Sequence, residues 1–106
     1  MPRYSKEYLA GQPLSEREKE VLALLALGLG NYQIAEDIHV STYTIRNHLW
    51  SIRIKTGIYS RTLLAFYAYA NGLVGKEAIK YAIKRERAIE GWMRANSITS
   101  PSSHKT

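Results

Sequence analysis

Signals for the start and the end of helices recur along this chain at short intervals. Ser15 and Glu18 form the pattern Ser-x-x-Glu, in which each side chain accepts a hydrogen bond from an otherwise unpaired backbone N–H at a helix start. The glycines of "GLG" at 28–30 and Gly57 are typical of residues that end a helix. No segment alternates polar and apolar residues for long enough to predict a strand. We therefore expect an all-α protein built from short helices.

The same signals set the expected boundaries of the helices. Each predicted helix has apolar residues at a spacing of three or four, which indicates one buried face. The first helix is predicted from Ser15 to the glycines at 28–30, and the second from a cap at Asn31 through Ile38. The third runs from a cap at Ser41 or Thr42 to about Thr56. The fourth covers 61–71 after a cap at Ser60, and the fifth covers 76–95.

The composition excludes several classes of protein and site. Cysteine is absent, which rules out disulfides and cysteine-based metal sites, and the three histidines have no paired ligand spacing. There is no nucleophile with a matching base, no glycine-rich phosphate loop and no cofactor signature, so we expect neither an enzyme nor a bound cofactor or metal. No apolar run approaches the roughly 20 residues of a membrane span, and the start lacks the apolar core of a signal peptide. We therefore expect a cytoplasmic protein with no membrane contact.

The charge of the chain is unevenly distributed. The 106 residues carry a net charge of +6, and residues 38–75 contain Arg46, Arg53, Lys55 and Arg61 but no aspartate or glutamate. A basic stretch without acidic residues suits a polyanionic partner such as a nucleic acid. Basic segments are also often ordinary solvated surface, so the charge alone leaves both interpretations open.

The predicted third helix has two faces of opposite character. At about 100° per residue, Ile45, Leu49 and Ile52 fall on one side and form the buried face. The opposite face carries Tyr43, Arg46, Asn47, Trp50, Arg53 and Ile54. An α-helix fits the major groove of B-DNA, where arginine can pair with guanine and asparagine with adenine. A short helix, a turn and this helix make a helix-turn-helix arrangement, in which the second helix contacts the bases.

This face also has an alternative interpretation. Exposed tryptophan, tyrosine and arginine are enriched among the residues that dominate protein–protein interfaces, so the same surface could bind a protein. The basic, acid-free setting of residues 38–75 favours double-stranded DNA as the partner.

A continuous stretch that covers over half of the chain resembles a known family. Residues 14–73 read "LSEREKEVLALLALGLGNYQIAEDIHVSTYTIRNHLWSIRIKTGIYSRTLLAFYAYANGL", which is similar to the LuxR-type (GerE-like) DNA-binding domain of bacterial transcription regulators. The similar positions occur in the order of the family and without gaps. They are Leu14, Glu18, Glu20, Val21, Leu22, Gly28, Asn31, Ile34, Ala35, Ser41, Thr44, Ile45, Arg46, His48, Ile52, Lys55, Gly57, Ser60 and Arg61.

The resemblance implies a four-helix domain whose third helix lies in the major groove and whose fourth helix often pairs two copies. Arg46 and Asn47 fall where the family contacts bases, and Trp50 falls at a further such site. Because Trp50 and Tyr43 depart from the charged residues common there, we expect them to contact thymine methyl groups or to stack along the backbone. The expected phosphate-contacting residues are Asn31, Tyr32, Thr44, His48, Arg53 and Lys55.

Some residues have a structural as well as a functional interpretation. His48 flanks the buried face of the third helix, so it could lie at the edge of the core instead of meeting a phosphate. For Arg61 we favour a structural contact with a carboxylate such as Glu18 or Glu20 over a contact with DNA. Ile54 points away from the buried face and suits a partner protein.

The predicted fifth helix, after the four of the domain, is amphipathic. Lys80, Lys84 and Arg87 group on one side, and Glu86 and Glu90 lie within the apolar stripe and weaken its second half. We expect this helix to pair with a second copy or to fold back on the domain, with another protein as the remaining partner. The apolar stripe comprises Ala78, Ile79, Ala82, Ile83, Ile89 and Met93. Most of the apolar side chains of the fourth helix are expected in the core, and the expected dimerisation residues are Leu64, Tyr67, Ile79 and Ile83.

These observations predict a free-standing transcription regulator that binds double-stranded DNA as a homodimer on repeated half-sites. Its expected parts are an N-terminal arm (1–13), the LuxR-type domain (14–74), a C-terminal helix (75–95) and a disordered tail (96–106). The main alternative is a protein-interaction module of the same fold that acts on RNA polymerase or another regulator. A sigma-factor region 4 fragment and a protein that coats DNA without sequence preference are further alternatives.

Overall fold

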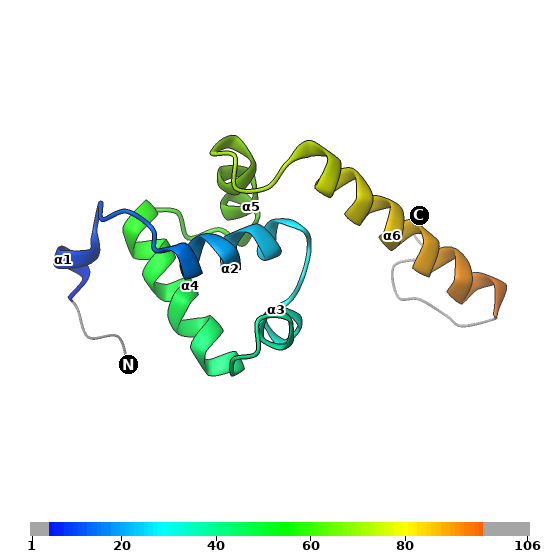
Figure 1. The fold of residues 1–106 in the computed structure, drawn as a ribbon, viewed down its shortest axis with the longest axis horizontal. Coiled ribbons are helices and arrows are strands. Elements are labelled where there is room, and N and C mark those ends of the chain that lie inside the picture. The colour runs from blue at the N-terminus through cyan, green and yellow to red at the C-terminus, as the bar shows by residue number, and fades with distance from the viewer. Residues whose placement is uncertain (1–4, 97–106) are drawn as a thin grey trace. The chain divides into compact units, whose positions relative to one another are not determined.

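The computed structural model describes residues 5–96, which form six helices and no strand (Figure 1). The expectation of an all-α fold is confirmed. The chain divides into two compact units, Met1–Gly75 and Lys76–Thr106, which are described separately below. The expected disordered tail, 96–106, lies outside the described residues apart from Asn96. The helices are α1 (Lys6–Leu9), α2 (Glu16–Ala26), α3 (Asn31–Asp37), α4 (Thr42–Thr56), α5 (Arg61–Ala70) and α6 (Lys76–Ala95).

Two of the predicted helix starts are confirmed by their hydrogen bonds. Ser15 Oγ accepts from the backbone N–H of Glu18 at 3.1 Å, and the carboxylate of Glu18 accepts from the N–H of Ser15 at 2.9 Å. Of the two residues considered as the cap of α4, Ser41 has this role, because its Oγ accepts from the N–H of Thr44 at 3.1 Å. Both helices therefore begin where their side chains pair the first backbone donors.

Helix α3 begins differently from the prediction. Its cap is Gly30, whose N–H donates to Gln33 Oε1 at 2.8 Å, and Asn31 is the first helical residue instead of the cap. Asn31 Oδ1 accepts from Arg61 Nη1 at 2.9 Å, while Arg61 Nη2 donates to the carbonyl of Leu29 at 2.9 Å. The structural role favoured for Arg61 is confirmed, but its partners are amide and carbonyl oxygens and not the expected carboxylates.

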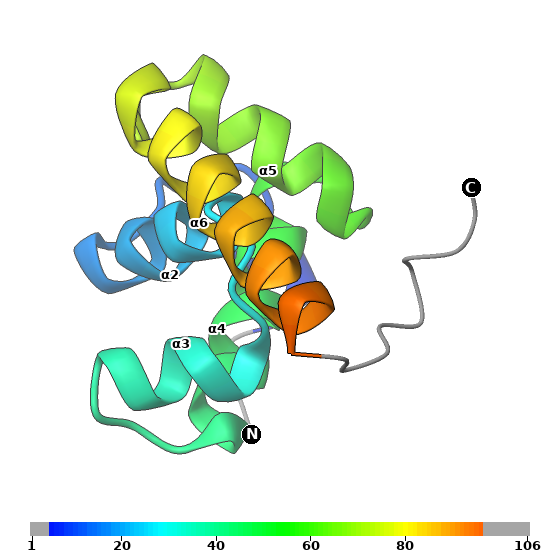
Figure 2. The same ribbon diagram turned by 90° about the vertical axis from the view of Figure 1, so that its right-hand side faces the viewer.

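The core of the first unit lies where α2 packs against α4 and α5. Helix α3 completes the unit by packing on α4 (Figure 2). Each fully buried Leu, Ile or Val side chain contributes about 1.5–3 kcal/mol relative to an exposed one. The largest fully buried side chains are Val21, Leu22, Ile34, Ile45, Leu49, Ile52 and Leu64.

Helix α5 turns a different set of side chains outward than the sequence predicted. Leu64 is fully buried within its own unit, so the expectation that it contacts a second copy is wrong. The side chains of Leu63 and Phe66 are 54% and 64% exposed, whereas Tyr67 is half-buried. Residues 63 and 66 are three apart and share the side of the helix that faces away from the core. The outward apolar surface of α5 therefore includes Leu63 and Phe66, although most apolar side chains of this helix were expected in the core.

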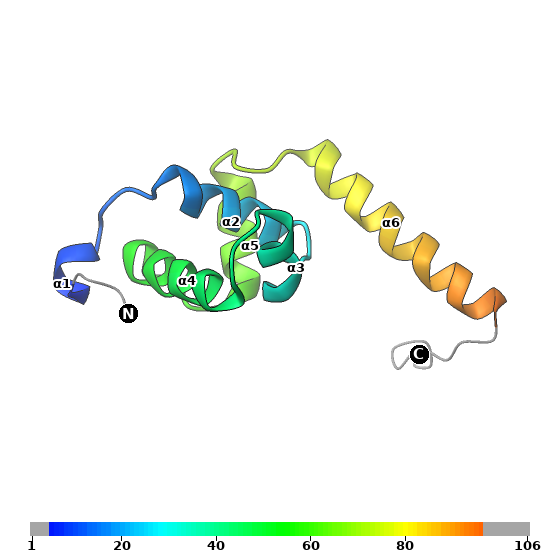
Figure 3. The ribbon, with the colours of Figure 1, turned by 60° about the horizontal axis from the view of Figure 1, so that its bottom comes forward.

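A short helix, α1, lies in the segment that was expected to be an arm. It contacts α4 near the C-terminal end of that helix, where the N–H of Gly11 donates to the carbonyl of Lys55 at 3.3 Å (Figure 3). Leu9 on α1 and Ile54 on α4 are both buried. The expectation that Ile54 points outward is therefore wrong, because the N-terminal segment packs against this part of α4.

Gly57 ends α4 in the left-handed conformation, with φ at +75°. A Cβ atom placed on Gly57 would meet no other atom within 4 Å, so the substitution Gly57→Ala would add backbone strain without a clash. We expect Gly57→Ala to lower the free energy of unfolding by about 1 kcal/mol, measured by urea unfolding. Gly57→Asn should lose less unfolding free energy than Gly57→Ala, because asparagine tolerates the left-handed conformation. Equal stability of Gly57→Ala and the parent would contradict this prediction.

The second unit contains α6, none of whose residues is buried. Of the residues expected to pair with a second copy, Ile79 is half-buried and Ile83 is exposed. Over residues 5–96, no helix combines the length and the apolar character needed to cross a lipid bilayer.

Candidate nucleic-acid interface

Helices α3 and α4 form a helix-turn-helix unit. The turn between them contains His39, whose φ of 62° is left-handed, and the N–H of Val40 donates to the carbonyl of Ala35 at 2.9 Å. This conformation ends α3 and reverses the chain so that α3 packs on the following helix. The turn therefore holds α3 against α4, as a helix-turn-helix requires.

One face of α4 is buried, and the other is open over residues 43–50, whereas Ile54 near its end is covered by α1. Ile45, Leu49 and Ile52 are buried in the core, as the sequence predicted. Spacings of three, four and seven residues place the expected base-contacting side chains together on the outer face. On that face Arg46 and Tyr43 are exposed, whereas Asn47 and Trp50 are half-buried. The four residues are Tyr43, Arg46, Asn47 and Trp50.

The two arginines of α4 differ in their hydrogen bonding. Within residues 5–96, Arg46 forms no hydrogen bond or ion pair with another side chain or carbonyl. Arg53 Nε donates to the carbonyl of Tyr59 at 3.1 Å and so holds the segment that follows α4. Because a guanidinium carries five N–H donors, Arg46 has its full donor set available to a ligand.

The residues at the helix starts already have intramolecular partners. Thr44 Oγ1 lies 3.0 Å from Ser41 Oγ, and the exposed Tyr32 donates its hydroxyl proton to Glu36 at 2.9 Å. Asn31 has its carbonyl oxygen engaged, which leaves its amide nitrogen as the donor. To donate to a phosphate, the hydroxyl group of Tyr32 would have to leave Glu36, whereas Thr44 can donate while it accepts from Ser41.

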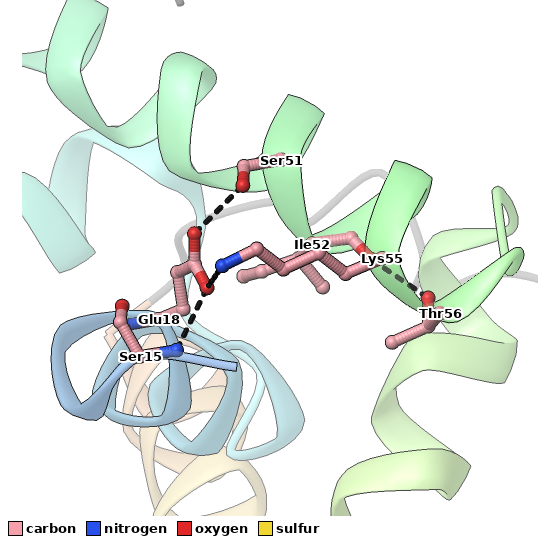
Figure 4. Close-up of polar contacts among 6 residues, drawn as sticks. All are labelled: Ser15, Glu18, Ser51, Ile52, Lys55 and Thr56. Carbon is pink, nitrogen blue, oxygen red and sulfur yellow. Dashed lines mark hydrogen bonds and ion pairs between the residues drawn. The ribbon is translucent and has the colours of Figure 1, made fainter. Parts of the chain in front are cut away.

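Lys55 lies inside the protein and not on the outer face of α4. Its Nζ donates to Glu18 Oε1 at 2.7 Å, and Ser51 Oγ donates to Glu18 Oε2 at 2.7 Å (Figure 4). The side chains of Lys55 and Glu18 are 11% and 7% exposed. The expectation of a phosphate contact by Lys55 is wrong, because its charge is balanced by Glu18 in an ion pair that connects α4 to α2.

The carboxylate of Glu18 stays charged in this environment. Burial alone would raise its pKa, but the hydrogen bonds donated by Lys55, the Ser15 N–H and Ser51 outweigh that effect and hold the pKa below its ordinary value of 4.5. This nearly buried carboxylate therefore caps the start of α2 through Ser15 and joins α2 to α4 through Lys55 and Ser51.

The sequence contained a signal for this ion pair. Ser51 and Lys55 are four residues apart on α4, and His48 falls on the same flank, whereas Arg46 falls on the other side of the buried stripe. A lysine beside a buried stripe can bury its ammonium group only with a carboxylate partner, and Glu18 was the glutamate already assigned to a helix start. The spacing on the helix, and not the charge, separates Lys55 from the residues on the outer face of α4.

His48 is half-buried on that flank of α4. Burial lowers its pKa below the ordinary value of 6.5, the Glu18 carboxylate opposes this shift, and Arg17 adds to it. His48 is therefore mainly neutral at neutral pH and lacks the charge that would attract a phosphate.

The lowered pKa of His48 predicts a dependence of stability on pH. The free energy of unfolding should fall as the pH drops below 6.5, because the unfolded state then binds a proton that the folded state resists. Urea unfolding over this range should show a weaker fall for His48→Gln than for the parent. An identical pH dependence in the two proteins would contradict a buried, neutral His48.

Away from this face, the surface of α2 is already balanced in charge. Arg17 pairs with Glu20 at 2.9 Å and Lys19 pairs with Glu16 at 3.3 Å.

Within residues 5–96, no cluster of histidine, aspartate or glutamate could hold a metal ion. A hollow of about 570 Å³ on this surface is lined by Glu16, Arg17, Lys19, Glu20, Ala23 and Leu73.

Comparisons with known proteins agree with this architecture. The transcriptional regulatory protein LnrK of Bacillus subtilis is 42% identical over 60 residues, which are 57% of this chain and 27% of LnrK. The transcriptional regulatory protein LiaR of the same organism is 36% identical over 66 residues, 62% of this chain and 31% of LiaR. The response regulator protein VraR of Staphylococcus aureus is 36% identical over 61 residues, 58% of this chain and 29% of VraR. The chain thus spans about three tenths of the length of these curated relatives, and no solved structure matches it.

The family match covers the helices that build the candidate interface. The family described as "Bacterial regulatory proteins, luxR family" matches residues 12–68, which include α2, α3 and α4 and most of α5. The resemblance noted from the sequence is therefore confirmed over more than half of the chain. This protein belongs to the luxR family of bacterial regulatory proteins and carries that family's DNA-binding helix-turn-helix domain.

Proposed function

We propose that this protein recognises specific sequences of double-stranded DNA by placing α4 in the major groove. The observation that carries the proposal is the exposed Arg46, which has no partner within residues 5–96 and lies on the outer surface of α4, beside the buried stripe of Ile45 and Leu49. The names of the relatives describe transcriptional and response regulators. We therefore propose regulation of transcription in the cytoplasm as the role of this protein.

The exposed face of α4 supports different roles for its side chains. Arg46 and Asn47 would pair with base edges, because arginine matches guanine and asparagine matches adenine in the major groove. Tyr43 and Trp50 would contact thymine methyl groups or the sugar–phosphate backbone. Phosphate contacts would come from Asn31, Tyr32, Thr44 and Arg53, with His48 limited to a neutral N–H donor and Lys55 excluded by its ion pair.

We further propose that the protein binds as a homodimer on repeated half-sites. One short helix contacts few base pairs, and two half-sites near one helical turn apart supply the additional affinity. The exposed Leu63 and Phe66, with the half-buried Tyr67, form the surface of α5 that suits such pairing. Ile79 and Ile83 on α6 would extend the contact between the copies.

Selection of bound duplexes from a random pool tests the proposal directly. We expect enrichment of a sequence with two related half-sites, and a mass of two chains per duplex by sedimentation. Binding without enrichment would indicate a protein that coats DNA. Absence of binding to any duplex at low salt would contradict the proposed function.

The exposed apolar side chains of α5 also support a second candidate function. Leu63 and Phe66 could contact RNA polymerase or another regulator instead of a second copy. Sedimentation of the free protein separates the two cases. A monomer at concentrations that saturate DNA would favour the heterologous partner.

A further inference from the structure

Helix α6 carries a row of cations along one side. Lys76, Lys80, Lys84 and Arg87 follow one another at spacings of four, four and three residues, which places them on the same face. All four are exposed, and none forms a hydrogen bond or an ion pair within residues 5–96. We call these four residues the α6 basic stripe.

The glutamates of α6 lie outside the α6 basic stripe. Glu86 and Glu90 fall on the apolar side of the helix, and Glu90 pairs with Arg94 at 3.0 Å. Glu77 lies at the edge of the stripe. The stripe is therefore a surface of concentrated positive charge that no internal ion pair balances, in contrast to the paired charges of α2.

We propose that the α6 basic stripe binds phosphate groups of the duplex that the helix-turn-helix recognises, and so adds affinity that is independent of sequence. This inference rests on the proposed function. From residue 76 to residue 87 a helix rises about 16 Å. Double-stranded DNA carries one negative charge for about every 1.7 Å of its axis, so even one strand offers several phosphates over this length.

The connection between the two units strengthens the argument for the same duplex. Only residues 71–75 separate α5 from α6, so the start of α6 stays within about 20 Å of the end of α5. A binding surface tethered this closely meets its ligand at an effective concentration in the millimolar range. Weak phosphate contacts can therefore contribute measurably to the total affinity.

The charges of α6 favour DNA over an anionic membrane. An amphipathic helix on a membrane buries its apolar side among the acyl chains, whereas lysine and arginine face the headgroups. Glu86 lies within the apolar side of α6, and its carboxylate would lose water without a partner in that position. Contact with DNA through the α6 basic stripe requires no burial of Glu86.

The test compares two triple variants of the full chain that lose the same charge. Lys80→Gln, Lys84→Gln and Arg87→Gln neutralise the stripe, whereas the control carries Arg17→Gln, Lys19→Gln and Arg85→Gln. Arg17 and Lys19 each lie within 3.3 Å of a glutamate, and the exposed Arg85 lies on the opposite side of α6 from the stripe. The association constant is measured against salt on the selected duplex and on a random duplex of about three helical turns.

We expect the salt dependence to change only in the stripe variant. Loss of three phosphate contacts should make the slope of log K against log salt shallower by about 2.7, equally on both duplexes. A third variant, with Lys80→Arg, Lys84→Arg and Arg87→Lys, should retain the slope of the parent, because the charge is kept.

The remaining outcomes separate this inference from the proposed function. A parent chain that binds no duplex would overturn the proposed function and this inference together. A parent that binds, with equal slopes in the stripe variant and the control, would overturn the inference alone. Stripe-dependent binding to vesicles of phosphatidylglycerol and phosphatidylcholine, with an unchanged slope on DNA, would assign the stripe to membranes and also overturn it.

Discussion

Glu18→Ala is expected to lower the free energy of unfolding by about 3 kcal/mol, measured by urea unfolding at neutral pH. The substitution leaves the ammonium group of Lys55 nearly buried without its counter-charge. It also removes the acceptor of the hydrogen bonds from Ser51 Oγ and the Ser15 N–H. Removing one partner of a buried ion pair lowers the stability by more than the intact pair contributes, because the remaining charge has neither water nor a partner around it.

Glu20→Ala is the matched control for this prediction. Glu20 lies two residues further along the same helix and pairs with Arg17 at 2.9 Å, but both side chains are exposed. An exposed pair contributes at most about 1 kcal/mol, so this variant should remain close to the parent in stability. Equal losses of unfolding free energy in the two variants would show that the ion pair of Glu18 stabilises the fold no more than a surface ion pair does.

The same carboxylate predicts how stability changes in acid. Because the pKa of Glu18 is lowered in the folded state, its contribution is complete above 4.5 and is lost as the pH falls through the folded pKa. The Glu18→Ala variant lacks this contribution. The difference in unfolding free energy between the parent and the variant should therefore shrink as the pH is lowered below 4.5.

Arg46→Ala is expected to relax the choice of DNA sequence. The variant should lose about 1–3 kcal/mol of discrimination between the selected site and a site with one changed base pair, at one position of each half-site. The reason is that a fork of two hydrogen bonds to guanine distinguishes bases, whereas a phosphate contact does not. Dissociation constants at one fixed salt concentration, for the selected site and its single-base variants, measure this effect.

Arg17→Ala provides the control for charge, because it removes one cation that is already paired. This variant should bind with the sequence preference of the parent. If Arg46→Ala instead weakened every sequence by the same factor, Arg46 would contact phosphate and the assignment of base contacts would be wrong.

Features that depend on neighbouring residues were predictable from the sequence. The caps at Ser15 and Ser41 and the end of α4 at Gly57 each follow from one side chain, or its absence, acting on backbone groups within four residues. The buried stripe of α4 follows from helical periodicity alone. The family match at residues 12–68 confirmed the domain type that these features indicated.

Features that depend on distant segments were not predictable in the same way. Lys55 belongs to a residue type that often binds phosphate, yet it pairs with Glu18, which is 37 positions earlier in the chain. Ile54 lies opposite the core stripe, yet it is buried where α1 packs on α4. Leu64 and Leu63 are adjacent and identical in type, and the packing of α5 on α2 buries one and exposes the other.

The amino-acid sequence alone established helices α2 to α6, the inner face of α4 and the outer position of Arg46 on it, because helix geometry relates residues that are a few positions apart. The tertiary structure decided which cations remain available to a ligand. Arg46 has no partner within residues 5–96, whereas Lys55 and Arg61 are held by groups from other elements. A charge can bind DNA only where the fold has not already paired it, and that pairing is set by contacts between segments far apart in the chain.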